Sequence, residues 1–376
     1  MNKVYIISGM RTPLGIYDGK LQAFTEQQLL SLLIKAMIEK DKVDPSLLDE
    51  IIIGCGKQTS TPSNIARHAA LMAEIPYEVP AYTVQCQSAS GLQAVAKGYW
   101  QIKSEASEMV LVGGVESMTN IPREIHDARY HFDRQTKVVY EPISAQLVGA
   151  QPEESYGALS NVAVAETIAE NYGISQAEIL SYAAGSHIKA KLRQSANHII
   201  PVEVKKKKAV EIVNCDEIYE HADWIAKPAD GAGLCLLAKE ETATRLNLPV
   251  LGSIQAIGIS AGDPSGAGWI GTEAVKKALA KANLLMAQIG LIAYNEIFAA
   301  SALAMKEELV KLGATNIDEI FNRDGGSLST GNAWGAMGTI LLIDLLHQMK
   351  EENIPYGLAI APAEGGQVVA CIVKSE

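Results

Sequence analysis

Residues 44–54 read DPSLLDEIIIG, and residues 283–294 read NLLMAQIGLIAY. Each stretch begins with a polar residue that can cap a helix and continues through a short amphipathic turn. Each then ends in an apolar run, which is typical of a strand buried on both faces. The same order of cap residue, short turn and buried strand therefore occurs twice, far apart in one chain.

The residues that follow the two stretches extend the repeat. After the first copy, SGLQAV (90–95) opens a predicted helix that leads to an apolar strand at 109–112. After the second copy, GAMGTI (335–340) opens a predicted helix that leads to a strand at 357–360. Two copies of one α/β unit predict a duplicated fold with pseudo-twofold symmetry.

Other segments show the same alternation of strands and helices. Residues 4–8 form an apolar run closed by Gly9, and residues 24–40 have the apolar spacing of a helix. The strand at 109–112 is expected to stop at the pair Gly113 and Gly114. This alternation predicts βαβ units and a mostly parallel, buried sheet.

The region between the copies differs in composition. Residues 117–245 are richer in charge and histidine, and helical spacing recurs at 163–172 and 176–192. We therefore expect an N-terminal half at 1–116, an inserted loop domain at 117–245 and a C-terminal half at 246–376. Such insertions commonly form binding surfaces in α/β folds.

Composition excludes several classes of protein. The net charge of −11 argues against a general nucleic-acid binder, which needs a basic surface. No apolar run is long enough for a membrane span, and the N-terminus lacks a signal-peptide pattern, so a cytoplasmic protein is expected. The five cysteines are scattered without metal-binding spacing, so no metal site is expected, and all but Cys86 are interpreted as small buried hydrophobes.

Seven sequence blocks follow one another along the chain. They are MRTPLG (10–15), NIARHAA (64–70), VPAYTV (79–84), SGLQAV (90–95), GGVESM (113–118), NEIFA (295–299) and the glycine frame at 325–338. In this order the blocks resemble the thiolase family, and the resemblance covers essentially the whole chain. It implies a five-layer αβαβα fold with a loop domain. It also implies an acyl-CoA C-acyltransferase of the acetyl-CoA acetyltransferase class, a CoA thioester as substrate without any other cofactor, and a homodimer or homotetramer.

The nucleophile block departs from the family pattern. The family places a cysteine before a Ser-Gly-Leu stretch, and the ungapped sequence QCQSASGL (85–92) puts Ser88 at that position. A serine hydroxyl needs an adjacent base to act as a nucleophile. A natural Ser88 would be weak or inert, whereas an engineered Cys→Ser change would trap substrate. Cys86 is a possible substitute if the loop is remodelled.

Two further blocks are altered. In GNAWG (331–335), Asn332 stands at the family's histidine position, where it either keeps an oxyanion contact or only satisfies a turn. In APAEGGQ (361–367), Pro362 stands at the position of the second cysteine, which is the family's base. Glu364 takes the first glycine position, and it is interpreted as a solvated loop residue, with a substitute base as the alternative.

The CoA-binding side has changed as well. The family's Ser-Gly-x-Asn-Asp-Gly-Ala becomes AKPADGA (226–232), so Ala226 replaces the serine that meets the pantetheine arm. Asp230 and Gly231 remain, and they could hold the turn without a ligand. Asn295 of the Asn-Glu-x-Phe block is retained.

These changes set the predicted function. Loss of the thiol, imidazole and second thiol predicts a thiolase-like protein with weak or absent thiolase activity, because catalytic groups act as a unit. The alternatives are a non-catalytic CoA-binding or structural subunit, and an acyltransferase or thioesterase that depends on Ser88. The last alternative requires a base near Ser88, and no histidine is a candidate.

Overall fold

The fold consists of two similar halves with a region of helices and a hairpin between them. The computed structural model describes residues 3–59, 61–126, 138–145, 148–193, 196–207 and 209–376. The N-terminal half comprises β1 (Val4–Arg11), β2 (Gly15–Ile16), α1 (Glu26–Asp41), β3 (Glu50–Gly54), α2 (Ile65–Met72), β4 (Ala81–Val84), α3 (Ser90–Lys103) and β5 (Met109–Ser117). The C-terminal half comprises β9 (Gly252–Ala261), α9 (Thr272–Ala282), β10 (Leu291–Tyr294), α10 (Ala299–Lys311), α11 (Ile317–Ile320), α12 (Ser327–Thr330), α13 (Trp334–Glu352), β11 (Tyr356–Ala363) and β12 (Gln367–Ser375).

The strand order confirms the predicted duplication. The strands follow the order β10-β11-β12-β9-β1-β8-β5-β3-β4, in which β8 (Ala229–Lys239) comes from the intervening region. The antiparallel pair β1 and β9 joins the two halves. On one side of this junction β1, β8, β5 and β3 are neighbours, and on the other side β9, β12, β11 and β10 repeat the same pairing directions. The two copies recognised in the sequence become the 3₁₀ helices Pro45–Leu47 and Met286–Gln288, which precede β3 and β10.

The prediction of a mostly parallel sheet is wrong. Among the described strands, parallel pairing joins β3 to β4, β3 to β5 and β10 to β11, whereas the other neighbours in the large sheet are antiparallel. All central strands are buried on both faces, so each is an apolar run whichever way it points. Apolar character therefore indicated burial and gave no information about direction.

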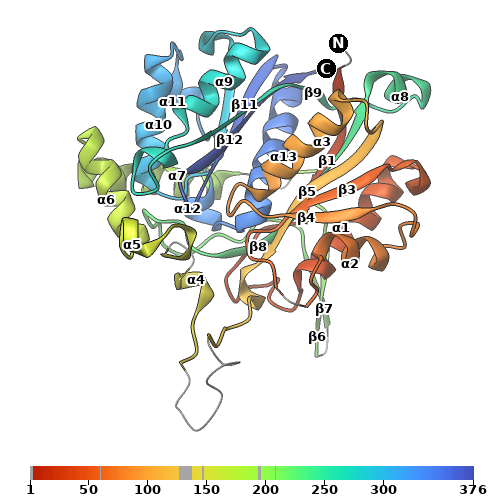
Figure 1. Ribbon diagram of the computed structural model, residues 1–376, viewed down its shortest axis with the longest axis horizontal. Coiled ribbons are helices and arrows are strands. Elements are labelled where there is room, and N and C mark those ends of the chain that lie inside the picture. The colour runs from red at the N-terminus through yellow and green to blue at the C-terminus, as the bar shows by residue number, and fades with distance from the viewer. Residues whose placement is uncertain (1–2, 60, 127–137, 146–147, 194–195, 208) are drawn as a thin grey trace.

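Helices separate and cover the two half-sheets in five layers (Figure 1). Helices α1 and α2 cover the N-terminal half-sheet, α9 and α10 cover the C-terminal one, and α3 and α13 pack against each other in the middle. Three clusters of buried apolar side chains fill the spaces: one beneath α1, one around α3 and α13, and one beneath α9 and α10. Close packing in these clusters fixes the positions of the helix ends that form the candidate site.

Strand β5 is longer than its sequence indicated. It runs through Gly113 and Gly114 to Ser117, where the glycine pair was expected to end it. A Cβ atom at Gly114 would lie 2.0 Å from the carbonyl oxygen of Gly335 at the start of α13. The glycine is needed there because backbone meets backbone at this contact.

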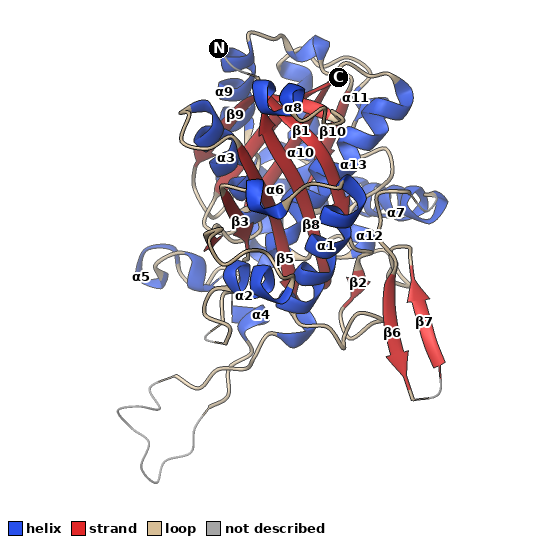
Figure 2. Cartoon of the chain, turned by 90° about the vertical axis from the view of Figure 1, so that its right-hand side faces the viewer, coloured by secondary structure: helices blue, strands red, loops and turns tan. Residues whose placement is uncertain are grey.

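The intervening region contains α4 (Pro142–Ala145), α5 (Glu153–Tyr156), α6 (Asn161–Tyr172), α7 (Gln176–Leu192), β6 (Val202–Lys206), β7 (Ala209–Val213), β8 (Ala229–Lys239) and α8 (Glu240–Arg245). The expected helices at 163–172 and 176–192 are confirmed, and the hairpin β6–β7 projects from the body (Figure 2). Strand β8, however, lies between β1 and β5. The proposed loop domain at 117–245 is therefore too wide at its C-terminal end, and the three-part division otherwise stays a proposal.

Candidate functional site

A tight turn between β4 and α3 places Ser88 at the start of a helix. Gln87 adopts a left-handed conformation with φ 47°, and Ser88 follows it directly before the cap residue Ala89. The hydroxyl of Ser90 accepts a hydrogen bond from the Cys86 N–H (2.8 Å) and donates one to the Gln87 carbonyl (2.6 Å). Ser88 is fully buried, and its place near the positive end of α3 suits an acceptor of negative charge.

Glu364 is the side chain that meets Ser88 from the other half of the chain. The Ser88 hydroxyl donates to Oε1 at 3.1 Å, and the Ser88 N–H donates to Oε2 at 3.2 Å. Glu364 lies in the turn between β11 and β12 and is only 6% exposed. Burial raises its pKa above the ordinary value, although the bonds from Ser88 oppose this shift.

The interpretation of Glu364 as a solvated loop residue is therefore wrong. The sequence of the turn at 364–366 is typical of an exposed turn, and Gly365 and Gly366 both have positive φ. Its glycines let it fold back against the α3 loop, so the carboxylate points inward. This contact spans 276 positions of sequence, and no local pattern indicates it.

Asn332 reaches Ser88 from the start of α13. Its Nδ2 donates to the Ser88 hydroxyl at 3.4 Å, and its Oδ1 accepts from Asn295 Nδ2 at 3.3 Å. Asn295 in turn accepts a hydrogen bond from the Ser327 hydroxyl at 2.8 Å. The Asn332 backbone N–H also donates to the Lys227 carbonyl at 2.7 Å, so this residue both fills a turn and contacts the site.

The remaining candidates do not supply an acid or a reactive thiol. Pro362 is buried in β11 opposite Val368 and has no titratable group. The Cys86 sulfur lies 3.9 Å from Gln367 Oε1, and burial followed by the nearby Glu364 carboxylate raises the pKa of its thiol. Cys86 therefore lacks the lowered pKa of a catalytic cysteine.

Residues 226–228 lead into β8, so Asp230 and Gly231 lie at the start of a strand and not in the expected turn. The Ala226 N–H donates to the Ile297 carbonyl at 2.9 Å, and Pro228 forms a bridge with Asn332. A hollow of 380 Å³ opens beside the segment 226–231. It is lined by Tyr17, Glu141, Ile143, Ser144, Tyr219, Lys227 and Pro228.

Asp230 faces the protein interior. Both of its carboxylate oxygens accept hydrogen bonds from Thr119, one from the backbone N–H (2.9 Å) and one from the hydroxyl (2.6 Å). Burial raises the pKa of Asp230 to about 6. A Cβ atom at Gly231 would lie 2.9 Å from Leu14, so this residue is small for packing reasons.

Two buried glutamates lie near the site: Glu116, which sequence reasoning did not single out, and Glu296, which it noted only as a retained part of the Asn-Glu-x-Phe block. Glu116 in β5 accepts backbone N–H bonds from Gly56 (2.7 Å), Lys57 (3.2 Å) and Gly335 (2.8 Å), and it thereby holds the start of α13. A carboxylate inside an otherwise apolar strand was the available signal, because an unpaired buried charge is costly.

Glu296 is the second of these glutamates. It is fully buried and accepts hydrogen bonds from Tyr182 (2.7 Å) and Ser186 on α7 and from Asn322 (3.0 Å). This carboxylate fixes α7 beside the residues that follow β10, which include Asn295.

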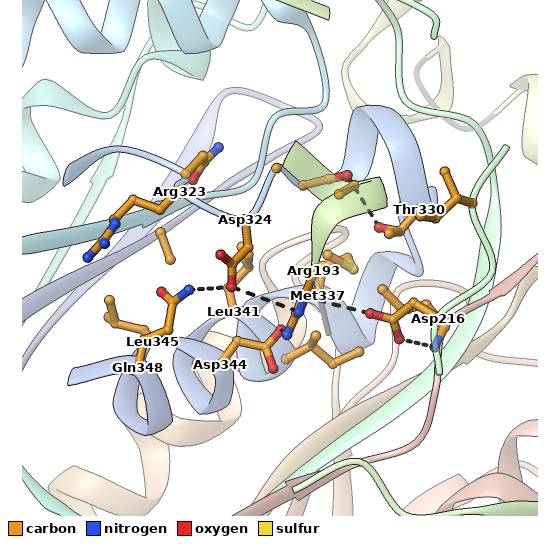
Figure 3. A pocket seen from close by; sticks show the side chains of 18 of the residues that line it. Arg193, Asp216, Arg323, Asp324, Thr330, Met337, Leu341, Asp344, Leu345 and Gln348 are labelled. Carbon is orange, nitrogen blue, oxygen red and sulfur yellow. Dashed lines mark hydrogen bonds and ion pairs between the residues drawn. The ribbon is translucent and has the colours of Figure 1, made fainter. Parts of the chain in front are cut away.

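A second cavity of 190 Å³ lies between the end of α7 and α13 (Figure 3). Two arginines and two aspartates there form one ion cluster. Arg193 contacts Asp344 at 2.8 Å and Asp216 at 3.7 Å, and the buried Arg11 binds the same two carboxylates at 2.7 Å each. We interpret this cluster as structural because each of its four charged groups pairs with another member.

Other expectations can be compared with the described residues. Cys55, Cys235 and Cys371 are buried as predicted, but Cys215 is exposed and that interpretation was wrong. No group of three or more His, Cys, Asp or Glu side chains in the described part could hold a metal ion. No described helix combines the length and apolar character that a bilayer crossing requires.

Comparison with known proteins agrees with this geometry. The thiolase N-terminal domain model matches residues 4–227, and the thiolase C-terminal domain model matches residues 248–375. The chain is 30% identical to a beta-ketoadipyl-CoA thiolase from Pseudomonas knackmussii, with 99% of each chain covered. It is 31% identical to a probable acetyl-CoA acyltransferase from Staphylococcus aureus, with 100% and 99% covered.

Solved structures show the same similarity. An acetyl-CoA acetyltransferase from Bacillus anthracis superposes with a TM-score of 0.92 at 27% identity, and a human mitochondrial 3-ketoacyl-CoA thiolase superposes with 0.90 at 28%. Both matches cover 100% of this chain and 99% of the other. With a duplicated five-layer fold and both domain models matched along its length, the chain belongs to the thiolase family of acyl-CoA acyltransferases.

Proposed function

We propose that this chain binds CoA thioesters in the thiolase manner but does not make or break carbon–carbon bonds at an enzymatic rate. One observation carries the proposal: the side chains that hydrogen-bond to Ser88, among the described residues, are a carboxylate and an amide. A hydroxyl stands where the family has its acyl-carrying thiol, and no hydrogen bond from an imidazole or a thiol to this hydroxyl is found in the described part of the chain.

Each replacement removes a different part of the chemistry. A serine hydroxyl ionises far above neutral pH, so Ser88 is a much weaker nucleophile than a thiolate. Asn332 can donate and accept hydrogen bonds but cannot transfer a proton near neutral pH. Pro362 cannot remove the proton alpha to a thioester, which the bond-forming step needs. Groups that act as a unit lose most of the rate when one is removed, and here three have changed.

The segment 226–231 is the proposed entry for the pantetheine arm. The segment contacts Asn332 directly, so an arm lying along it would end at the Ser88 site. The hollow beside it offers the cation of Lys227 and the rings of Tyr17 and Tyr219. Cationic and aromatic groups suit the phosphates and adenine of CoA. The relatives include a beta-ketoadipyl-CoA thiolase and a probable acetyl-CoA acyltransferase, which supports the same ligand class.

Calorimetry with acetyl-CoA tests the binding proposal. We expect heat of binding from the wild-type chain and an affinity about two- to fivefold weaker for Lys227→Ala, because one partly exposed charge is lost. Lys276→Ala is a matched control. Both lysines pair with a carboxylate three or four residues away, and their side chains are 39% and 49% exposed.

Absence of binding to the folded wild-type chain would contradict the proposal and favour a purely structural subunit. If the two lysine changes weaken the affinity equally, the ligand binds away from the segment 226–231.

A further inference from the structure

We propose that Ser88 and Glu364 form a nucleophile–base pair that hydrolyses CoA thioesters. This inference rests on the proposed binding of CoA thioesters and adds a reaction to it. The pair joins a helix-start hydroxyl to a buried carboxylate, and the Ser88 hydroxyl donates to Glu364 at 3.1 Å. A nucleophile within hydrogen-bond reach of a base is the arrangement that activates a serine.

A directional chain of hydrogen bonds aims the Ser88 proton at Glu364. The Ser327 hydroxyl donates to Asn295 Oδ1 at 2.8 Å, so the Asn295 amide nitrogen points to Asn332 Oδ1 at 3.3 Å. The Asn332 amide nitrogen then points to the Ser88 oxygen at 3.4 Å. The Ser88 oxygen receives a donor from one side, and its own hydrogen is directed to the carboxylate on the other side.

The surroundings of Glu364 suit a base. The carboxylate is 6% exposed, so it is poorly hydrated, and it accepts hydrogen bonds from its own backbone and from the N–H and hydroxyl of Ser88. Cys86 is the titratable side chain that faces it in the described chain, and its thiol stays protonated because its own pKa is raised. Burial also raises the pKa of Glu364, which moves its proton affinity toward neutral pH.

The reaction balances with water as the co-reactant. The Ser88 oxygen attacks the thioester carbonyl carbon while its proton moves to Glu364. The carbon–sulfur bond breaks, and the CoA thiolate takes the proton from Glu364, leaving an acyl ester on Ser88. Water then attacks this ester and gives a proton to Glu364. The carbon–oxygen bond to Ser88 breaks, the proton returns to the serine oxygen, and a free acid is released.

Protonation of Glu364 also frees a donor for the developing oxyanion. In the resting site the Ser88 N–H donates to Glu364 Oε2 at 3.2 Å. A neutral carboxylic acid holds this N–H less strongly than a carboxylate does. The N–H at the start of α3 is then available where negative charge develops.

The test measures free CoA released from acetyl-CoA, quantified by chromatography. We expect release by the wild-type chain, and loss of at least about a hundredfold in Glu364→Gln, because general base catalysis typically supplies this much. Ser88→Ala should release CoA no faster than buffer. Glu26→Gln is the matched control, since Glu26 is a buried carboxylate outside the site and its change should leave release unaltered.

Two further readouts separate catalysis from a structural role. The rate should fall as pH falls through the raised pKa of Glu364, because the carboxylate must be ionised to accept the proton. Asn332→Ala should lower the rate at every pH without moving that midpoint, since Asn332 orients Ser88 and does not titrate. Thermal unfolding confirms that each variant is folded.

Two results of the release assay would overturn the proposal. The first is CoA release from the wild-type chain that survives Glu364→Gln, and the second is acetyl-CoA that binds but stays intact. The second result leaves the binding proposal standing, whereas absence of calorimetric binding to folded Ser88→Ala and wild-type chains alike would remove both proposals. An acetyl group found by mass spectrometry on Cys86 would also contradict the assignment of Ser88.

Discussion

Four buried glutamates differ in what meets their oxygens, and this difference decides what each can do. Glu116 is held by three backbone N–H groups, and Glu296 by two hydroxyls and an amide. Glu364 accepts hydrogen bonds from the hydroxyl and the N–H of Ser88. Glu26 is 5% exposed, and its Oε1 has no hydrogen-bond partner among the described residues. A buried carboxylate with fewer partners is harder to ionise.

Glu26→Gln should make stability less dependent on pH. Burial first, and repulsion from Glu116 second, raise the pKa of Glu26 from 4.5 to about 7. The folded chain therefore holds a proton that the unfolded chain releases, so stability is lost as pH rises from the unfolded pKa through the folded one. The shift corresponds to roughly 3 kcal/mol, which the glutamine variant should not lose.

Urea unfolding at pH 4 and pH 8 measures this difference. Glu39→Gln, an exposed position on the same helix, is the control and should change stability at neither pH. A wild-type chain and a Glu26→Gln variant that lose stability in parallel would contradict the assignment.

At the scale of elements, the loops that lead into α3 and α13 bring two residues of the candidate site together, Ser88 just before α3 and Asn332 just before α13. The close approach of the two helices depends on glycines, since a Cβ at Gly338 would lie 2.8 Å from the Cβ and backbone nitrogen of Leu92. The sequence predicted both helices and the strands that follow them from apolar spacing. It did not predict strand direction or the continuation of β5 through its glycines, because these depend on neighbours distant in sequence.

Gly338→Ala should destabilise the fold by about 1–3 kcal/mol, because an extra methyl group overpacks the contact between α3 and α13. Gly185→Ala in α7 is the matched control: it is also inside a helix, but nothing lies within 4 Å of its Cβ position. Alanine there should stabilise by about 0.5–1 kcal/mol. Opposite signs in urea unfolding are the expected result, and equal effects would contradict this packing account.

At the scale of the whole molecule, the site exists only when both halves are packed together. Ser88 comes from the N-terminal half, while Asn295, Asn332 and Glu364 come from the C-terminal half. The sequence named all four residues because each lies in a recognisable block. It gave Glu364 the wrong environment because a turn sequence does not show which surface it will meet.

One buried ion cluster ties three regions of the chain together. Arg11 on β1 is fully buried and binds Asp216, which follows the hairpin, and Asp344 on α13. Arg11→Met should cost about 3–5 kcal/mol, because it leaves two buried carboxylates without their main partner. Arg245→Met breaks an exposed pair with Glu108 and should cost about 0–1 kcal/mol. Similar losses in the two variants would show that the Arg11 cluster is not structural.

The formation of acetyl-CoA from acetoacetyl-CoA and CoA tests the account most directly. The reaction requires cleavage of a carbon–carbon bond, and among the described residues the Ser88 hydroxyl has a carboxylate and an amide as side-chain partners in place of the family's catalytic groups. We expect the wild-type chain to form acetyl-CoA no faster than Ser88→Ala, even where calorimetry shows the thioester bound. Acetyl-CoA formed by the wild-type chain at a rate typical of an enzyme would contradict it.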